Sequence, residues 1–115
     1  MVKTVSLRKN YMFRFVYNKG KSTANKLLVM YILNNNTDCN RLGVCCSKKV
    51  GGSVVRSRVT RLIKESYRLH EKDVKTGLDI IVVARNSCSE ATFSQIESAQ
   101  LHLLTKHKLI NTQQN

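Results

Sequence analysis

The chain has 115 residues, of which 42% are hydrophobic, and it includes four Tyr and three Phe. This composition supplies one modest core and leaves no room for two, so we expect a single domain over residues 1–115, with a polar tail from about residue 111. Twenty Lys and Arg stand against seven Asp and Glu, which gives a formal net charge of +13. Because so much like charge is costly unless a polyanion neutralises it, nucleic acid is the leading class of partner.

The sequence gives no sign of a membrane partner or of export. No stretch approaches the roughly 20 apolar residues of a membrane-spanning helix, and the N-terminus contains no apolar signal core. We therefore expect a cytoplasmic protein with no membrane partner.

The cysteines fit neither a zinc site nor a disulfide framework. Cys39, Cys45, Cys46 and Cys88 contain no C-x-x-C pair and lie far in sequence from the histidines. The adjacent Cys45 and Cys46 would point to opposite faces of a strand. We therefore expect reduced thiols and no metal held by the protein.

The first predicted element is an amphipathic helix from Asn10 to Lys19, with Asn10 as its cap and Gly20 as its stop. Its apolar face consists, at helical spacing, of Met12, Phe13, Val16 and Tyr17. A strand is predicted next, over Lys26 to Leu33, and it closes at the polar turn of residues 34–40.

A second strand spans Arg41 to Lys49 and alternates between two faces. Its core face carries Leu42, Val44 and Cys46, and its other face carries Gly43, Cys45, Ser47 and Lys49. Gly51 and Gly52 then end the strand, and Ser53 is a suitable cap for a helix from Val54 to about His70.

The remaining elements set the fold class. The run Leu78 to Arg85 is apolar on both faces, as in a central strand, and a loop over 86–91 leads to a helix from Thr92 to about Leu109. The strands at 41–49 and 78–85 are joined through a helix, so we expect them to be parallel. The pattern predicts the α+β class, with one two-layer α/β sandwich made of a small mixed sheet and helices.

The most informative segment is Lys48 to Arg68, which holds seven cations in 21 residues. At about 100° per residue, the buried stripe of its helix consists of Val55, Val59, Leu62 and Ile63. The opposite arc is an outward cationic ridge made of Arg58, Arg61, Lys64 and Arg68. Arg56 lies about 200° from Arg58 and is expected at the other edge of the stripe.

Those charges call for an external anion. Lys48 and Lys49 precede the helix, and its first turn offers free N–H groups and the positive end of the dipole to a phosphate. A merely solvated helix face is the alternative, but only Glu65 is near enough to neutralise the ridge.

This segment resembles the signature of the bacterial ribonuclease P protein family, in which a Lys-Lys-Ile/Val-Gly run leads into a helix carrying two arginines separated by one residue. The similarity extends over most of the chain, through Phe13, Val16, Tyr17 and Gly20, Ala24-Asn25-Lys26, Val29 and Tyr31, Arg41-Leu42-Gly43-Val44, and Asp79 to Arg85. The chain departs from the family where Ser57 replaces the usual Asn and Thr60 replaces a basic residue, which weakens one donor and one charge.

The resemblance implies a fold like the second domain of ribosomal protein S5, with a left-handed βαβ crossover. It implies a protein with no catalytic residue of its own, monomeric in a 1:1 ribonucleoprotein, whose catalytic RNA and associated Mg²⁺ remove the 5′ leader from precursor tRNA. The residues implied in binding the RNA subunit are Lys48, Lys49, Arg56, Arg58, Arg61, Lys64 and Arg68. Those implied in a leader-binding cleft are Phe13, Tyr17, Lys26, Val29, Tyr31, Cys45, Ser47 and Lys49.

Other interpretations remain open at this point. A ribosomal or general RNA-binding protein suits the size and charge equally well, and only the Lys48 to Arg68 pattern separates it from the family. An enzyme acting alone, such as a metal-dependent nuclease, fits less well because the carboxylates are dispersed along the chain. Phosphate-binding loops of the form G-x-x-x-x-G-K-[ST] or G-x-G-x-x-G are absent from the sequence. From periodicity alone, Phe13 and Tyr17 would simply be core residues.

Overall fold

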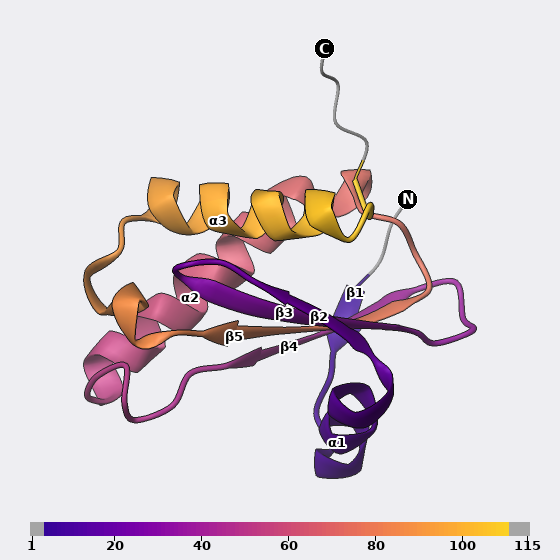
Figure 1. Ribbon diagram of the computed structural model, residues 1–115, viewed down its shortest axis with the longest axis horizontal. Helices are drawn as coiled ribbons and strands as arrows, with labels where there is room; N and C mark the ends of the chain where they lie inside the picture. Colours follow the sequence, from indigo (N-terminus) through magenta and orange to yellow (C-terminus); the bar gives the residue numbers. More distant parts are fainter. Residues whose placement is uncertain (1–3, 111–115) are drawn as a thin grey trace.

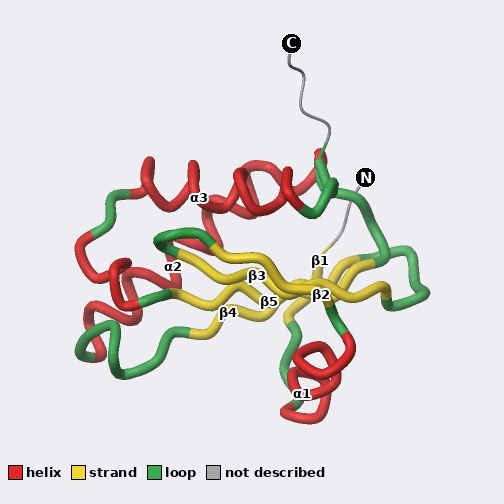
Figure 2. The backbone as a smooth tube through the Cα atoms, viewed as in Figure 1, coloured by secondary structure: helices red, strands yellow, loops and turns green. Residues whose placement is uncertain are grey.

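The computed structural model describes residues 4–110 and contains a five-stranded mixed sheet with helices on both faces (Figures 1 and 2). The strand order is β1-β4-β5-β3-β2, in which β4 is parallel to β1 and β5, and β3 is antiparallel to β5 and β2. The elements are β1 (Thr4–Ser6), α1 (Asn10–Lys19), β2 (Lys21–Ala24), β3 (Leu28–Asn34), β4 (Asn40–Cys45), α2 (Ser53–His70), β5 (Leu78–Ala84) and α3 (Phe93–Lys106), with 3-10 turns η1 (Glu71–Asp73) and η2 (Asn86–Glu90).

The predicted class, the mixed sheet and the parallel pairing of the strands at 41–49 and 78–85 are confirmed. The two edge strands, β1 and β2, were not predicted. The loop expected over 86–91 contains the short 3-10 turn η2. The polar tail predicted from about residue 111 lies outside the described residues.

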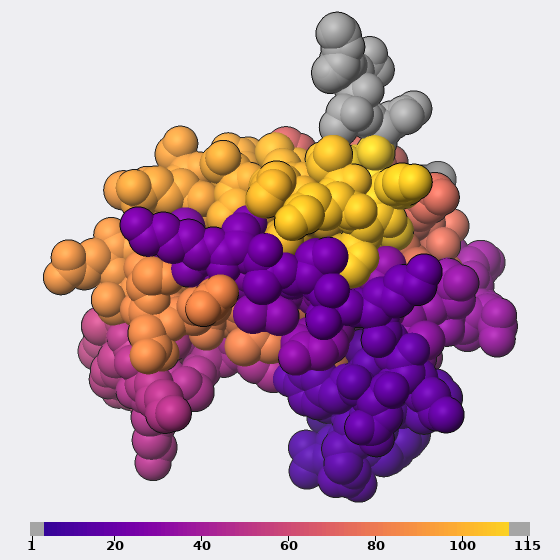
Figure 3. Space-filling view, viewed as in Figure 1, coloured from indigo at the N-terminus to yellow at the C-terminus, as the bar shows by residue number. Residues whose placement is uncertain are grey.

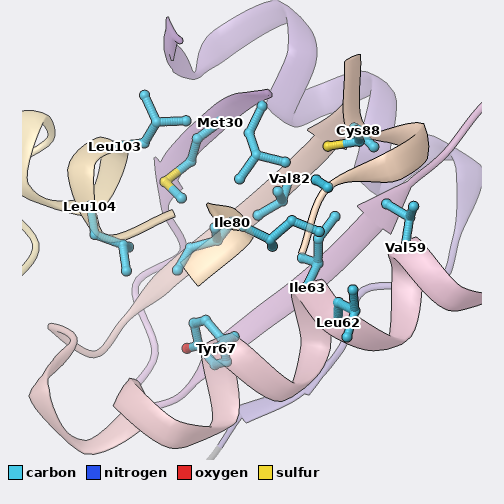
Figure 4. Packing of buried hydrophobic residues seen from close by; sticks show 14 of the residues in the cluster. Met30, Val59, Leu62, Ile63, Tyr67, Ile80, Val82, Cys88, Leu103 and Leu104 are labelled. Atoms are coloured by element: carbon cyan, nitrogen blue, oxygen red, sulfur yellow. The ribbon is translucent and has the colours of Figure 1, made fainter. Parts of the chain in front are cut away.

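The main core lies between the sheet and the layer formed by α2 and α3. Strand β5 is at the centre of the sheet and is buried on both faces, as its sequence predicted. Figure 4 shows the packing between the layers, which involves Met30, Ile80 and Val82 of the sheet, Val59, Leu62, Ile63 and Tyr67 of α2, and Leu103 and Leu104 of α3. Each such side chain contributes about 1.5–3 kcal/mol when fully buried, so this layer carries most of the stability.

A smaller cluster holds α1 on the opposite face of the sheet. Val16 of α1 is fully buried against Ile81, a residue of β5 that points away from α2 and α3. Phe13 lies directly over Gly43, where an added Cβ atom would be 2.6 Å from the Phe13 ring. The glycine therefore permits the close approach of α1 to β4.

Several predicted boundaries were wrong for identifiable reasons. The N-cap positions of α1 and α2 are occupied by Lys9 and Gly52. Asn10 and Ser53, which we predicted as caps, are instead the first helical residues of α1 and α2. Strand β3 begins at Leu28, two residues later than predicted, because the Asn25 side chain forms a turn by accepting a hydrogen bond from the Leu28 N–H at 3.0 Å. The predicted strand 41–49 ends at Cys45, and the predicted helix 92–109 ends at Lys106.

Candidate nucleic-acid interface

A basic groove runs between α2 and the edge of β4. Its volume is about 610 Å³, and it is lined by Val44, Cys46, Ser53, Arg56, Ser57, Thr60, Arg61 and Lys64. Three cations and three hydroxyl groups thus share one concave surface, which suits it to phosphate oxygens. Ser57 and Thr60, the two departures from the family pattern, both lie in this groove, where their hydroxyls remain able to donate.

The structure reverses the predicted arrangement of the paired arginines. Arg56 lies in the groove with Arg61 and Lys64, and its Nε donates to the Gly51 carbonyl at 3.1 Å. Arg58, which we expected in the outward ridge, instead turns toward η2, where its guanidinium donates to the carbonyls of Ser89 and Ala91. Both arginines flank the apolar stripe of α2. The Gly51 carbonyl fixes the direction of Arg56, and the carbonyls of Ser89 and Ala91 fix that of Arg58.

The cationic ridge therefore consists of Arg61, Lys64 and Arg68, all exposed. Lys64 and Arg68 also line a second hollow of about 210 Å³ between α2 and β1, so the ridge continues past the groove. Within residues 4–110, Arg41 forms an ion pair with Asp79 and His70 is hydrogen-bonded to Glu97, and neither pair involves the ridge. These three charges are consequently available to an external polyanion.

On the opposite face of the sheet, the predicted aromatic residues meet. The ring centroids of Tyr17 and Tyr31 are 4.8 Å apart in an edge-to-face arrangement, and those of Phe13 and Tyr17 are 6.4 Å apart. The Tyr17 hydroxyl lies 3.4 Å from the Cys45 sulfur. Burial, with this hydrogen bond as a second cause, raises the pKa of Tyr17.

Beside these rings, α1 leaves one row of the sheet only partly covered. Val29 pairs with Val83, and Val83 pairs in turn with Cys45, so these three side chains lie next to one another on the same face. All three are only partly buried, and Ser47, two residues beyond the end of β4, is exposed. The row provides a floor of small side chains bordered by the tyrosines.

A basic hollow of about 660 Å³ lies at the end of the sheet to which this row leads. It is lined by Asn25, Lys26, Lys49, Arg85, Asn86 and Ser87. Lys26 and Lys49, both predicted for the leader-binding cleft, therefore lie together, and Lys48 is exposed beside Lys49. Arg85 was missed as a site residue, although alternation along its strand puts it on the same face as Val83. Its Nη1 donates to the Asn25 carbonyl at 3.0 Å, which holds the guanidinium at the hollow.

The acidic and thiol side chains of residues 4–110 are dispersed over the structure. Asp79 is buried and receives two hydrogen bonds from Arg41, at 2.6 and 3.0 Å. Across residues 4–110, His, Cys, Asp and Glu side chains do not gather in groups of three or more. The four cysteines are free thiols, and burial raises the pKa of both Cys46 and Cys88. Among the helices of this described part, none combines the length and apolar character needed to cross a membrane.

A cationic helix on one face, with aromatic rings beside a basic hollow on the other, is an arrangement typical of RNA-binding proteins. Comparison with known proteins identifies the family. The Ribonuclease P family model matches residues 1–108. The chain is 61% identical over 105 residues to the ribonuclease P protein component of Alkaliphilus metalliredigens, with 91% of this chain and 95% of that relative covered.

Solved structures agree with this assignment. The RNase P protein of Staphylococcus aureus superimposes with a TM-score of 0.87 at 37% identity, covering 95% of this chain and all of the other. The RNase P protein of Thermotoga maritima gives a TM-score of 0.81 at 28% identity, covering 88% of this chain and 96% of the other. The chain belongs to the ribonuclease P protein family, whose members are components of a tRNA-processing endoribonuclease. The alternative of a ribosomal or general RNA-binding protein is not favoured.

Proposed function

We propose that the chain is the RNA-binding protein subunit of a ribonuclease P whose catalytic groups reside in the RNA subunit. The groove and ridge of α2 dock on that RNA, and the aromatic sheet face with its basic hollow binds the 5′ leader of precursor tRNA. The observation that carries this proposal is the separation of the two surfaces, since the aromatic rings lie on the face of the sheet that α2 and α3 leave open.

The α2 surface suits a folded RNA. Its cations face outward from a rigid helix, and they contact phosphate without needing access to base edges. Arg56, in the groove, adds a fixed guanidinium because its Nε is already bound to the Gly51 carbonyl. A guanidinium held in this way loses little side-chain entropy on binding phosphate.

The opposite face suits a single strand. Bases stack on aromatic rings with little regard to sequence, and each stacked base contributes roughly 1–3 kcal/mol. Tyr17, with 39% of its surface exposed, offers a ring to such a base, while Lys26, Lys49 and Arg85 neutralise the phosphates that follow. This face therefore distinguishes precursor tRNA, which has a leader, from mature tRNA, which has none.

The chemistry of phosphodiester cleavage belongs, in this proposal, to the RNA and its Mg²⁺ ions. The described carboxylates of the protein fit a Mg²⁺ site poorly, because Asp79 is bound to Arg41 and because, within residues 4–110, His, Cys, Asp and Glu side chains do not gather in groups of three or more. The protein acts by positioning the leader and by screening the repulsion between two RNA molecules. It works as one copy per RNA subunit, in the cytoplasm.

An assay on labelled precursor tRNA tests the proposal. Cleavage is measured with protein alone, with RNA subunit alone and with both, at low Mg²⁺; stimulation should require the RNA, and cleavage by protein alone would refute the proposal. The two surfaces are tested separately by substitution. Arg61→Ala with Lys64→Ala should weaken binding to the RNA subunit. Tyr17→Ala should instead lower the preference for precursor over mature tRNA by about fivefold or more, and the control Tyr17→Phe should retain this preference. If both classes of variant lose the same function, the two-surface assignment is wrong.

A further inference from the structure

Two aromatic side chains on α1 have no role in the fold or in either surface described above. Tyr11 and Phe15 are 63% and 57% exposed, respectively. They are four residues apart, so their rings are neighbours on one face of the helix. Single exposed apolar residues are common on protein surfaces, but adjacent exposed rings form a contiguous apolar patch, which indicates a binding surface. Figure 3 shows α1 projecting from the body of the molecule.

These rings lie on the flank of α1 away from the leader-binding face. Tyr17 is directed toward Cys45 and Tyr31, on one side of the helix. Tyr11 lies about 120° from Tyr17 around the helix axis. The pKa of Arg41 is raised mainly by its hydrogen bonds to Asp79, with a minor contribution from Tyr11. Aromatic rings therefore border α1 on both flanks.

The charges around the rings select the kind of partner. Residues 8–21 include five cations and no acidic residue. The exposed cations of this segment are Arg8, Lys9, Arg14, Lys19 and Lys21. In the described part of the chain none of the five forms an ion pair. A second copy of the chain on this face would set cations against cations, so the face fits a polyanion.

A duplex offers phosphates but keeps its bases stacked inside, whereas a single strand offers both phosphates and free base faces. We propose that Tyr11 and Phe15 form an outer stacking surface for the part of the 5′ leader farthest from the cleavage site. The leader would leave the Tyr17 and Tyr31 rings, cross the cationic outer side of α1 beside Arg14, and stack on Phe15 and Tyr11. This inference rests on the proposed function of the opposite flank as the leader-binding face.

The test uses the holoenzyme reconstituted with its RNA subunit. Precursor tRNAs with unstructured leaders, lengthened one nucleotide at a time, are bound to wild type and to the double variant Tyr11→Ala with Phe15→Ala. The variant should bind short leaders as wild type does and long leaders about fivefold more weakly, which is the loss of one stacked base at the lower end of the usual range. A matched control, Tyr11→Phe with Phe15→Tyr, keeps both rings and should follow wild type at every length.

The outcomes separate the outer surface from the proposed function. Parallel binding curves for wild type and the double variant at all leader lengths would overturn the outer surface. So would sedimentation in which wild type self-associates and the double variant does not, because the patch would then bind a second copy. Tyr17→Ala should weaken the binding of short and long leaders alike. If Tyr17→Ala has no effect at any length, it is the proposed leader-binding face that fails. Photocrosslinks from 4-thiouridine should reach Tyr11 or Phe15 from distal leader positions only.

Discussion

Arg58 and Arg61 lie three residues apart on α2, yet they occupy different surroundings. Arg58 is half-buried and donates to the main-chain carbonyls of Ser89 and Ala91, whereas Arg61 is exposed at the edge of the groove. Arg58 thereby ties η2, which carries the Asn86 and Ser87 side of the basic hollow, to the helix that faces the RNA subunit.

Replacing Arg58 should therefore lower the stability of the fold, whereas replacing Arg61 should weaken RNA binding. Arg58→Ala leaves the buried Ala91 carbonyl without its charged donor, and we expect it to lower the free energy of unfolding by about 1–3 kcal/mol. Arg61→Ala should change stability by no more than about 0.5 kcal/mol and weaken binding to the RNA subunit. Urea unfolding and RNA titration of both variants check this. If Arg58→Ala keeps full stability but loses RNA affinity, its guanidinium serves the RNA.

Gly43 controls the position of the leader-binding rings. A Cβ atom there would come within 2.6 Å of the Phe13 ring, so Gly43→Ala must push Phe13 and α1 away from the sheet. We expect a cost of about 1–3 kcal/mol from overpacking, together with weaker leader binding as Tyr17 moves off Tyr31. Thermal unfolding and leader affinity measure the two effects. Adding Phe13→Leu should restore stability by relieving the clash, and failure of this rescue would show that the contact with Phe13 is not the cause.

Among the elements, the long periodic ones followed from the sequence, and the short ones did not. Helix α2 and strand β5 have apolar patterns long enough to identify them, and α1 was predicted with its observed ends. Strands β1 and β2 have three and four residues, too few for any alternation to stand out. They form because β4 and β3 offer open edges, and an edge belongs to the folded sheet rather than to the local sequence.

The candidate site shows the same limit. A helical wheel gives the angle between Arg56 and Arg58, but it does not say that η2 covers one edge of the stripe and leaves the other open. Lys26 and Lys49 came from the family resemblance, and their meeting with Arg85 depends on three chain segments that converge only in the folded protein. The third cation of the hollow is Arg85. Its position directly after the buried strand β5, with the polar Asn86 next to it, was the sequence signal that could have identified it as a site residue.

Helix α3 is attached to the sheet through a histidine that should make stability depend on pH. The His107 Nε2 lies 2.9 Å from the Thr23 hydroxyl and 3.3 Å from the Met30 carbonyl. Burial lowers the pKa of His107 below its usual 6.5, and Lys21 and Lys106 lower it further against the opposing effect of the Met30 carbonyl.

The unfolded chain therefore binds a proton at His107 more readily than the folded protein does. Stability contributed by neutral His107 is complete above pH 6.5 and declines as the pH falls toward the lowered value. We expect the unfolding free energy to decrease from about pH 7 to pH 5 more steeply in wild type than in His107→Gln. His102→Gln, which changes an exposed histidine within α3, is the control. Equal slopes for wild type and His107→Gln would contradict the prediction.

The 20 basic residues and the net charge of +13 attract any RNA, but the ridge and the rings should respond differently to salt. Binding through phosphate contacts releases counterions, and the logarithm of affinity falls with that of salt concentration by roughly 0.7–0.9 per contact. Stacking on a ring releases no such ions. Salt dependence therefore separates the two surfaces within one protein.

Arg61→Ala with Lys64→Ala removes two phosphate contacts, so the salt slope for binding the RNA subunit should decrease by roughly 1.5. Tyr17→Ala should weaken the binding of precursor tRNA to the holoenzyme by a similar factor at every salt concentration and leave the slope unchanged. Lys106→Ala is the matched control for charge, because Lys106 is exposed on α3 and lines neither the groove nor the basic hollow. Binding isotherms over a range of KCl concentrations give all three slopes. If Lys106→Ala lowers the slope as much as one ridge substitution does, the RNA subunit is attracted by the overall charge of the protein rather than held by α2.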